Sequence, residues 1–310
     1  MGAGLGHADA AAPDKQGLLP ALPAVSANEY DLSHSAAPSF RRLTTCRAIH
    51  VARRRLTVAS MRDFSVDEAT FAVVDVETTG VNPALDRVVE VACVVVRGGR
   101  ETQCFSSLVD PDRPIPPRAS AIHHLTDRDV AGQPRLEEVA PIVEALCAGA
   151  VVTGHNLSFD LRFLTMLQFR SSLCTLRLAR HCFPELDGHA NQLLRYALEG
   201  VPRGYGNAHR ALDDARVTAS VLQVLLRRYR ELGGKDSVEA LVSHASSRVA
   251  VGVLPFGEHR GKPLDQIPAA YLEWVHGRSK SFDRDITESV SSELERRATI
   301  RNPLQGSVPA

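Results

Sequence analysis

The sequence predicts an α/β protein in which a mixed β-sheet is flanked by helices and followed by a small C-terminal α+β module. Three observations lead to this fold class. Three apolar runs rich in β-branched residues follow one another at hairpin spacing between residues 71 and 109. Helical apolar patterns then alternate with short apolar runs as far as residue 232. Gly233 and Gly234 separate this region from a shorter one that carries its own aromatic residues.

Length and composition narrow the class of protein. The chain has 310 residues, enough for one large or two modest domains, and its 44% hydrophobic and 23% charged content is typical of a soluble globular protein. No apolar run reaches the length of a membrane span. The six cysteines show no regular spacing, which argues against a zinc site or a disulfide framework and favours the cytoplasm. Residues 63–240 hold 19 basic and 24 acidic residues, a balance that suits a metal site.

Residues 1–62 show no clear hydrophobic period and are rich in alanine, proline, serine and glycine, so we expect them to be disordered or a non-native extension. A transit peptide is one alternative, but four acidic residues argue against it. A basic arm that contacts nucleic acid is another, because arginines cluster between residues 41 and 55. We favour Met61 as the physiological start, because the organised sequence begins directly after it.

The first three strands are predicted at residues 71–76, 88–97 and 103–109, and their spacing should give an antiparallel meander. Four prolines exclude a helix interior from residues 110–117. Two short strands are expected later, at residues 150–153 and 173–175. Helices are expected at residues 119–124, 136–148, 158–168, 176–180, 191–199 and 212–232.

Two carboxylates stand at the end of the first strand, in the stretch Val73–Gly80. Side chains alternate along a strand, so Asp75 and Glu77 should emerge on the same face. Two neighbouring carboxylates repel each other and cost stability unless a cation lies between them. Oxygen ligands of this kind suit Mg²⁺ or Mn²⁺. A strand that runs out into a polar turn is the simpler interpretation of this pair taken alone.

Two later helices also begin with acidic residues. Asp160 lies in the first turn of a helix that Ser158 should cap, and Asp214 lies in the first turn of the long helix near residue 212. Carboxylates in a first turn are favoured by the helix dipole, which gives both residues a structural interpretation as well. His209 precedes the second of these helices and would by itself be read as a surface histidine.

Taken together and in this order, the motifs resemble the DEDDh 3′–5′ exonuclease superfamily over residues 72–226. The matching elements are Asp75-x-Glu77 on a strand, Asn156-x-x-Phe159-Asp160 opening a helix, and a histidine five residues before Asp214. The branch with a tyrosine four residues before that aspartate does not match, because Arg210 stands there. The resemblance implies an RNase H-like fold.

The resemblance also implies the catalytic roles. Two Mg²⁺ ions, with Mn²⁺ as an alternative, would be held by four carboxylates: Asp75, Glu77, Asp160 and Asp214. Phosphodiester hydrolysis needs a nucleophilic water, in-line geometry and neutralised phosphate charge, and a metal pair supplies all three. His209 would take the proton from the attacking water, which suits a group that titrates near neutrality.

Six substrate-binding residues are implied as well: Thr78, Thr79, Gly80, His123, Asn156 and Phe159. The backbone at the first three should receive the terminal 3′-hydroxyl and sugar. Phe159 should pack on the terminal base, with a plain core position as the alternative. The segment that contains His123 carries His124 where the family has glycine, which leaves its backbone role open.

The C-terminal region contains a second resemblance. Residues 255–263 and 271–274 follow a pattern of Phe-Gly-x-x-Arg-Gly-Lys and Tyr-Leu-x-Trp that is similar to the C-terminal module of the exodeoxyribonuclease X family. Arg260 and Lys262 lie on a glycine-rich turn and should grip phosphates. For Tyr271 and Trp274 we favour a core position over base stacking.

The predicted organisation is an extension at 1–62, an exonuclease domain at 63–233, a linker at 234–248, the C-terminal module at 249–302 and a tail at 303–310. The resemblance implies hydrolysis of single-stranded DNA from a free 3′ end, with release of nucleoside 5′-monophosphates and a role in DNA repair. An exoribonuclease, a polymerase proofreading subunit and a non-catalytic nucleic-acid binder stay open as alternatives. A homodimer is left open.

Overall fold

The computed structural model describes residues 64–301 except 187, 205, 207 and 279–281. The expectations for residues 1–62 therefore lie outside the described residues. None of the helices within the described ranges is long and apolar enough to cross a membrane.

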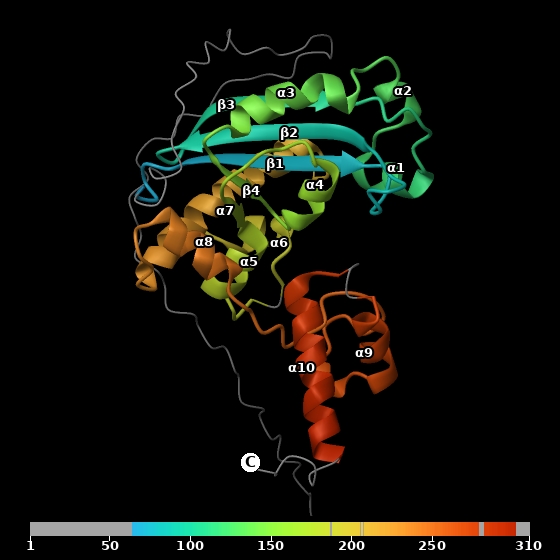
Figure 1. The fold of residues 1–310 in the computed structure, drawn as a ribbon, viewed down its shortest axis with the longest axis vertical. Coiled ribbons are helices and arrows are strands. Elements are labelled where there is room, and N and C mark those ends of the chain that lie inside the picture. The colour runs from blue at the N-terminus through green and yellow to red at the C-terminus, as the bar shows by residue number, and fades with distance from the viewer. Residues whose placement is uncertain (1–63, 187, 205, 207, 279–281, 302–310) are drawn as a thin grey trace, which may run out of the picture. The chain divides into compact units, whose positions relative to one another are not determined.

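One five-stranded mixed sheet organises the larger part of the chain (Figure 1). Its strands are β1 Thr70–Thr78, β2 Val88–Arg97, β3 Arg100–Leu108, β4 Val151–Gly154 and β5 Ser172–Cys174. They are ordered β3-β2-β1-β4-β5. β1 pairs antiparallel with β2, and β2 with β3, whereas β4 runs parallel to both β1 and β5. This topology confirms the predicted mixed sheet and its antiparallel meander.

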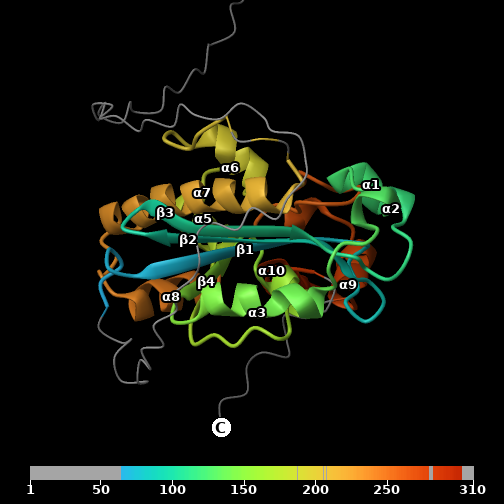
Figure 2. The same ribbon diagram turned by 90° about the horizontal axis from the view of Figure 1, so that it is seen from above.

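The helices of this part are α1 Pro117–His123, α2 Asp127–Val130, α3 Leu136–Cys147, α4 Ser158–Phe163, α5 Thr175–Cys182, α6 Asn191–Ala197, α7 Ala211–Glu231 and α8 Val238–Ser246. α3 covers one face of the sheet and α7 covers the other (Figure 2). Both were expected within a residue or two of their observed bounds, because their apolar spacing is that of amphipathic helices.

Alternation along the central strand decides which side chains meet which helix. Val74 and Val76 lie in the core that α3 closes, whereas Val73 packs with Ala211 and Ala215 of α7. Asp75 and Glu77 share the parity of Val73, so they point toward the α7 side. The start of α7 is therefore brought over the two carboxylates of β1.

Two helix ends differ from the expectation. The helix predicted over 158–168 ends at Phe163, and Ser158 is its first residue instead of its cap, because Leu157 occupies the capping position without a side-chain bond. The chain beyond it turns so that Leu164 and Leu167 enter the core. α1 ends at His123 and is capped by His124, whose φ of 61° is the left-handed conformation that glycine adopts most easily.

The residues after 250 have an apolar core of their own. The helices α9 Ala269–His276 and α10 Arg284–Arg301 contribute Leu272 and Val290 to this core. The short 3₁₀ turn η2 Leu264–Gln266 precedes α9. The hairpin predicted before this turn is wrong. An isolated bridge between Val253 and Pro263 forms there in place of two paired strands.

Ion pairs join the start of α10 to α5. Asp285 is fully buried, and its two carboxylate oxygens lie 3.0 Å from Arg177 and 2.8 Å from Arg180. Arg180 also lies 2.8 Å from Asp283. A buried carboxylate requires such partners, because water no longer stabilises its charge.

Candidate active site

The end of β1 carries the first two acidic residues of the site. Burial raises the pKa of Asp75 well above its usual value, and the charges of Asp160 and Glu77 raise it further. Burial also raises the pKa of Glu77 to about 8, with the charges of Asp214 and Glu90 as the next causes. Carboxylates from four separate segments therefore face one small region.

Asp160 enters this region from the first turn of α4. Its side chain is 4% exposed, and Oδ1 accepts a hydrogen bond of 3.1 Å from the backbone N–H of Val76. That N–H lies between the two acidic residues of β1, so Asp160 is tied directly to the strand that carries them. Burial raises the pKa of Asp160 to about 8.

Asp214 is held in place by two hydrogen bonds. Oδ2 accepts one of 2.7 Å from the backbone N–H of His209, and Oδ1 accepts one of 2.6 Å from the side chain of Gln192. Burial raises the pKa of Asp214. Gln192 could not be singled out from the sequence, because its role depends on α6 lying beside α7.

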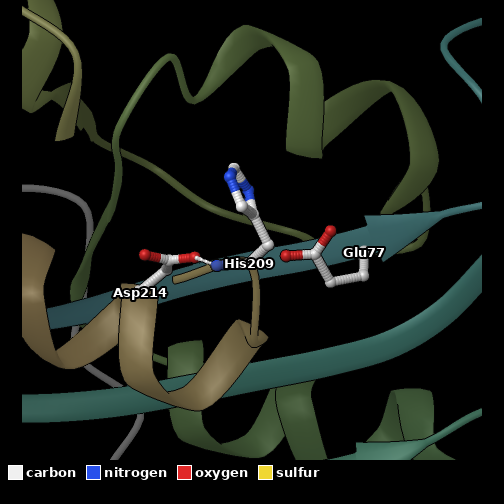
Figure 3. A group of neighbouring side chains, drawn as sticks. All are labelled: Glu77, His209 and Asp214. Atoms are coloured by element: carbon white, nitrogen blue, oxygen red, sulfur yellow. Dashed lines mark hydrogen bonds between the residues drawn. The ribbon is translucent and has the colours of Figure 1, made fainter. Parts of the chain in front are cut away.

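His209 lies two residues before the start of α7 and has a φ of 64°, a left-handed conformation that turns the chain toward the helix. Ligand atoms of Glu77, His209 and Asp214 all lie within 4.8 Å of one another. Figure 3 shows the Glu77 and Asp214 carboxylates on either side of His209, with the bond from the His209 amide to Asp214 dashed. This is the tightest set of potential metal ligands within the described ranges; Asp75 and Asp160 lie outside it but act on it electrostatically.

Glu90 is a further acidic residue that the sequence analysis missed. It pairs with Glu77 across the β1–β2 ladder and is 3% exposed. Its carboxylate accepts bonds of 3.1 and 2.9 Å from Arg210 and one of 3.1 Å from the backbone N–H of Ala211. The available signal was one carboxylate inside the otherwise apolar run Val88–Val96.

This donor set fits divalent metal ions. Burial raises the pKa values of all four carboxylates, and neighbouring carboxylates raise those of Asp75 and Glu77 further, so the metal-free site lacks compensating positive charge. Carboxylate oxygens are the ligands that Mg²⁺ and Mn²⁺ prefer. Asp75, Glu77, Asp160 and Asp214 are therefore the residues that would hold such ions.

The loop after β1 is fixed by its own side chains. The Thr79 hydroxyl donates to Asp86 at 3.2 Å and accepts from the backbone N–H of Arg87 at 3.0 Å, whereas the Thr78 hydroxyl donates to the Gly80 carbonyl at 2.7 Å. A Cβ at Gly80 would lie 2.5 Å from a carboxylate oxygen of Asp86. These threonine side chains are occupied within the loop, which leaves its backbone as the part that can meet a ligand.

Three other expected substrate residues differ in their exposure. His123 is 1% exposed and accepts a bond of 3.1 Å from the Leu125 N–H, a position that favours support of the loop over the expected substrate contact. Asn156 is half-buried and has a φ of 63°. Phe159 is half-buried, with its ring centroid 5.2 Å from that of Phe163. Phe159 thus borders the core, and the guanidinium of Arg162 lies 5.4 Å from its ring centroid.

Comparisons with known proteins give a consistent result. Residues 72–222 match the family model described as Exonuclease, RNase_T. The chain is 36% identical to DNA polymerase III subunit epsilon of Aquifex aeolicus, over 54% of this chain and 84% of that protein. It is 33% identical to the same subunit of Treponema pallidum, over 59% of this chain and 87% of that protein.

Larger proteins and solved structures are also similar to this chain. The match to DNA polymerase III PolC-type of Thermotoga maritima is 32% identical and covers 55% of this chain but 13% of that protein. The structure of exonuclease X in complex with 5′ overhanging duplex DNA is 31% identical, with a TM-score of 0.46, over 57% of this chain and 99% of that chain.

Proposed function

The chain belongs to the DEDDh exonuclease superfamily, whose members act on nucleic acid, and on that premise we propose that it is a metal-dependent 3′–5′ exonuclease of DNA. It would remove nucleoside 5′-monophosphates from a free 3′ end, preferably of a single strand. The observation that carries the proposal is the meeting of Glu77, His209 and Asp214 within 4.8 Å, beside the half-buried Asp75 and the buried Asp160.

The residues divide the chemical work between them. When bound, a pair of divalent ions supplies Lewis-acid activation of water and neutralises phosphate charge. Asp75, Glu77, Asp160 and Asp214 supply the negative charge that holds such ions. The hydrogen bonds from Val76 to Asp160 and from Gln192 to Asp214 fix the direction of two of these carboxylates before any ligand arrives.

His209 acts as the general base. Its imidazole is exposed, so it can reach a water at the mouth of the site, and its backbone is anchored to Asp214. The water oxygen forms a bond to phosphorus while its proton passes to His209. The bond from phosphorus to the 3′-oxygen of the preceding nucleotide breaks, and that oxygen leaves as the new 3′-hydroxyl after it gains a proton.

DNA is the favoured substrate because the two relatives that are matched over most of their length are named as DNA polymerase subunits. The same names favour a second candidate function, that of a proofreading subunit of a DNA polymerase. Hydrolysis of RNA is the remaining alternative, since no residue described here distinguishes a 2′-hydroxyl.

The test uses matched DNA and RNA oligonucleotides, labelled at the 5′ or the 3′ end, with Mg²⁺ or EDTA. We expect a Mg²⁺-dependent ladder from 5′-labelled DNA and immediate mononucleotide release from 3′-labelled DNA. Asp75→Ala should abolish both. Cleavage of RNA alone would replace the DNA proposal, and cleavage that persists in Asp75→Ala would show that the site is wrong.

A further inference from the structure

Three cations of the C-terminal region are not used in ion pairs. Arg260, Lys262 and Arg278 are exposed, and none of them meets a carboxylate within the described ranges. The other arginines of this region whose side chains are described do meet carboxylates: Arg284 pairs with Glu288, and Arg296 and Arg297 pair with Glu293. Among the residues of this region whose side chains the structure describes, free positive charge is therefore confined to Arg260, Lys262 and Arg278.

Two of these cations, Lys262 and Arg278, contact the two ends of a chain of neighbouring aromatic rings. The Lys262 ammonium lies 3.4 Å from Nδ1 of His259, whose ring centroid is 4.6 Å from that of Tyr271. The Tyr271 ring lies 5.4 Å from that of Trp274. The guanidinium of Arg278 lies 4.6 Å from the centre of the Trp274 ring. We call these five residues and Arg260 the aromatic–cationic surface.

Trp274 does not fill the core of this region. It is 43% exposed, although Leu272 and Val275 on the same helix are fully buried. The expectation that Trp274 is a core residue is therefore wrong, whereas Tyr271 is half-buried and packs against the core. An exposed tryptophan beside a cation offers a flat apolar face to a planar ligand.

The turn that carries two of the cations is held against α9. Gly257 has a φ of 71°, and a Cβ there would collide with the Tyr271 hydroxyl. Gly261 has a φ of 81°, and its N–H donates to the Leu254 carbonyl at 2.8 Å. The carboxylate on this turn, Glu258, lies 3.1 Å from the His259 ring. Arg260 and Lys262 are thus displayed by a defined turn and not by a free loop.

We propose that the aromatic–cationic surface binds single-stranded nucleic acid, with a base stacked on Trp274 and phosphates paired with Arg260, Lys262 and Arg278. Exposed cations beside an exposed ring offer the two kinds of contact that a single strand uses, which are phosphate pairing and base stacking. The inference rests on the proposed function for its purpose, which is to hold the strand outside the catalytic site. Binding itself needs neither the metal ions nor His209.

The sole tryptophan of the chain allows a direct test, because Trp274 is the only residue that contributes indole fluorescence. We would titrate the full chain, in EDTA, with a 20-nucleotide oligothymidylate. Saturable quenching of the Trp274 fluorescence is expected. The logarithm of the association constant should fall linearly with the logarithm of the salt concentration, with a slope of about −2 for three phosphate contacts.

The variants test the individual contacts. Lys262→Ala and Arg260→Ala should each reduce the magnitude of this slope by about 0.7. Trp274→Ala, followed by anisotropy of a labelled oligonucleotide, should weaken binding about 10-fold, and Trp274→Phe should restore most of it.

Arg296→Ala is the matched control, because it removes an equal charge that already pairs with a carboxylate of this region. Circular dichroism would verify that each variant is folded. Full binding of a labelled oligonucleotide without a change in Trp274 fluorescence would overturn the inference and point to another partner, such as a protein. So would equal losses in Arg296→Ala and Lys262→Ala. If the oligonucleotide quenches Trp274 fluorescence but the protein shows no exonuclease activity, the proposed function is wrong and the inference about this surface stands.

Discussion

Arg210 and Glu90 form a two-pronged ion pair, with Nε 3.1 Å from Oε2 and Nη2 2.9 Å from Oε1, directly beside His209. The same carboxylate accepts the N–H of Ala211, the first residue of α7. Glu90 thus joins β2 to the segment that presents the general base and Asp214. The pair also places a positive charge near Glu77, and that charge opposes the rise in the pKa of Glu77.

We predict that Arg210→Ala lowers kcat by about 10- to 100-fold, the range found for residues that orient a catalytic group, and changes KM much less. Glu90→Gln should act in the same direction with a smaller effect, because an amide can still accept one bond from Arg210. Steady-state kinetics on a short single-stranded oligonucleotide would measure both.

Arg216→Ala is the control for that experiment. Arg216 lies on the same helix and forms an equivalent two-pronged pair with Glu101, at 3.1 and 3.0 Å, on an exposed part of the surface. Arg216→Ala should change kcat by less than about twofold, because exposed ion pairs contribute little to stability. Equal losses in Arg210→Ala and Arg216→Ala would mean that the effect comes from α7 stability and not from the position of His209.

Asp75→Asn should separate activity from stability. Activity should fall by about 1,000-fold or more, because the catalytic groups act as a unit. The metal-free protein should at the same time become more stable, because burial and the neighbouring carboxylates disfavour an ionisable carboxyl group at this position. Urea unfolding in EDTA would measure this change, with Glu199→Gln at an exposed position as the control. Loss of stability in Asp75→Asn would contradict the electrostatic description of the site.

The stability of the metal-free protein should decrease as the pH rises. The pKa values of Glu77 and Asp160 are each raised to about 8, so folding favours their protonated forms. Their contribution to stability is present in full below the unfolded values near 4 and is lost as the pH rises through 8. Tm in EDTA should therefore fall between pH 6 and pH 9.

Mg²⁺ should have the opposite effect over the same interval. Carboxylates bind metal when ionised, so the rise in Tm caused by Mg²⁺ should grow from pH 6 to pH 9. Differential scanning fluorimetry with MgCl₂ or EDTA would measure both curves. Identical pH profiles with and without Mg²⁺ would show that these carboxylates do not hold the metal.

The ion pairs between α5 and α10 should matter for stability. Asp285→Ala would leave Arg177 and Arg180 without their buried partner, at a cost of about 3–5 kcal/mol. Urea unfolding would test this, with Glu288→Ala as the control because Glu288 pairs with the exposed Arg284. Glu288→Ala should cost less than about 1 kcal/mol. Similar costs for both variants would refute a special role for the buried pair.

Local patterns were sufficient to predict the meander, the two long helices and the parity of Asp75 and Glu77, because each depends on residues that are neighbours in the sequence. Glu90 and Gln192 could not be found in this way. Their roles arise from contacts with residues 120 and 22 positions away, made only after the sheet and α7 assemble. The exposure of Trp274 was missed for a related reason, since a helix pattern shows which residues share a face and not how far the core extends.

Three of the four non-glycine residues with left-handed backbone within the described ranges are His124, Asn156 and His209. Such a conformation costs roughly 1–2 kcal/mol for a residue with a side chain. Glycine at position 124 should therefore give a more heat-resistant protein without touching the proposed reaction. Glycine at position 209 would release the same energy but remove the base. At His209, the backbone conformation that presents the base therefore costs stability, and a substitution that recovered this stability would abolish the proposed activity.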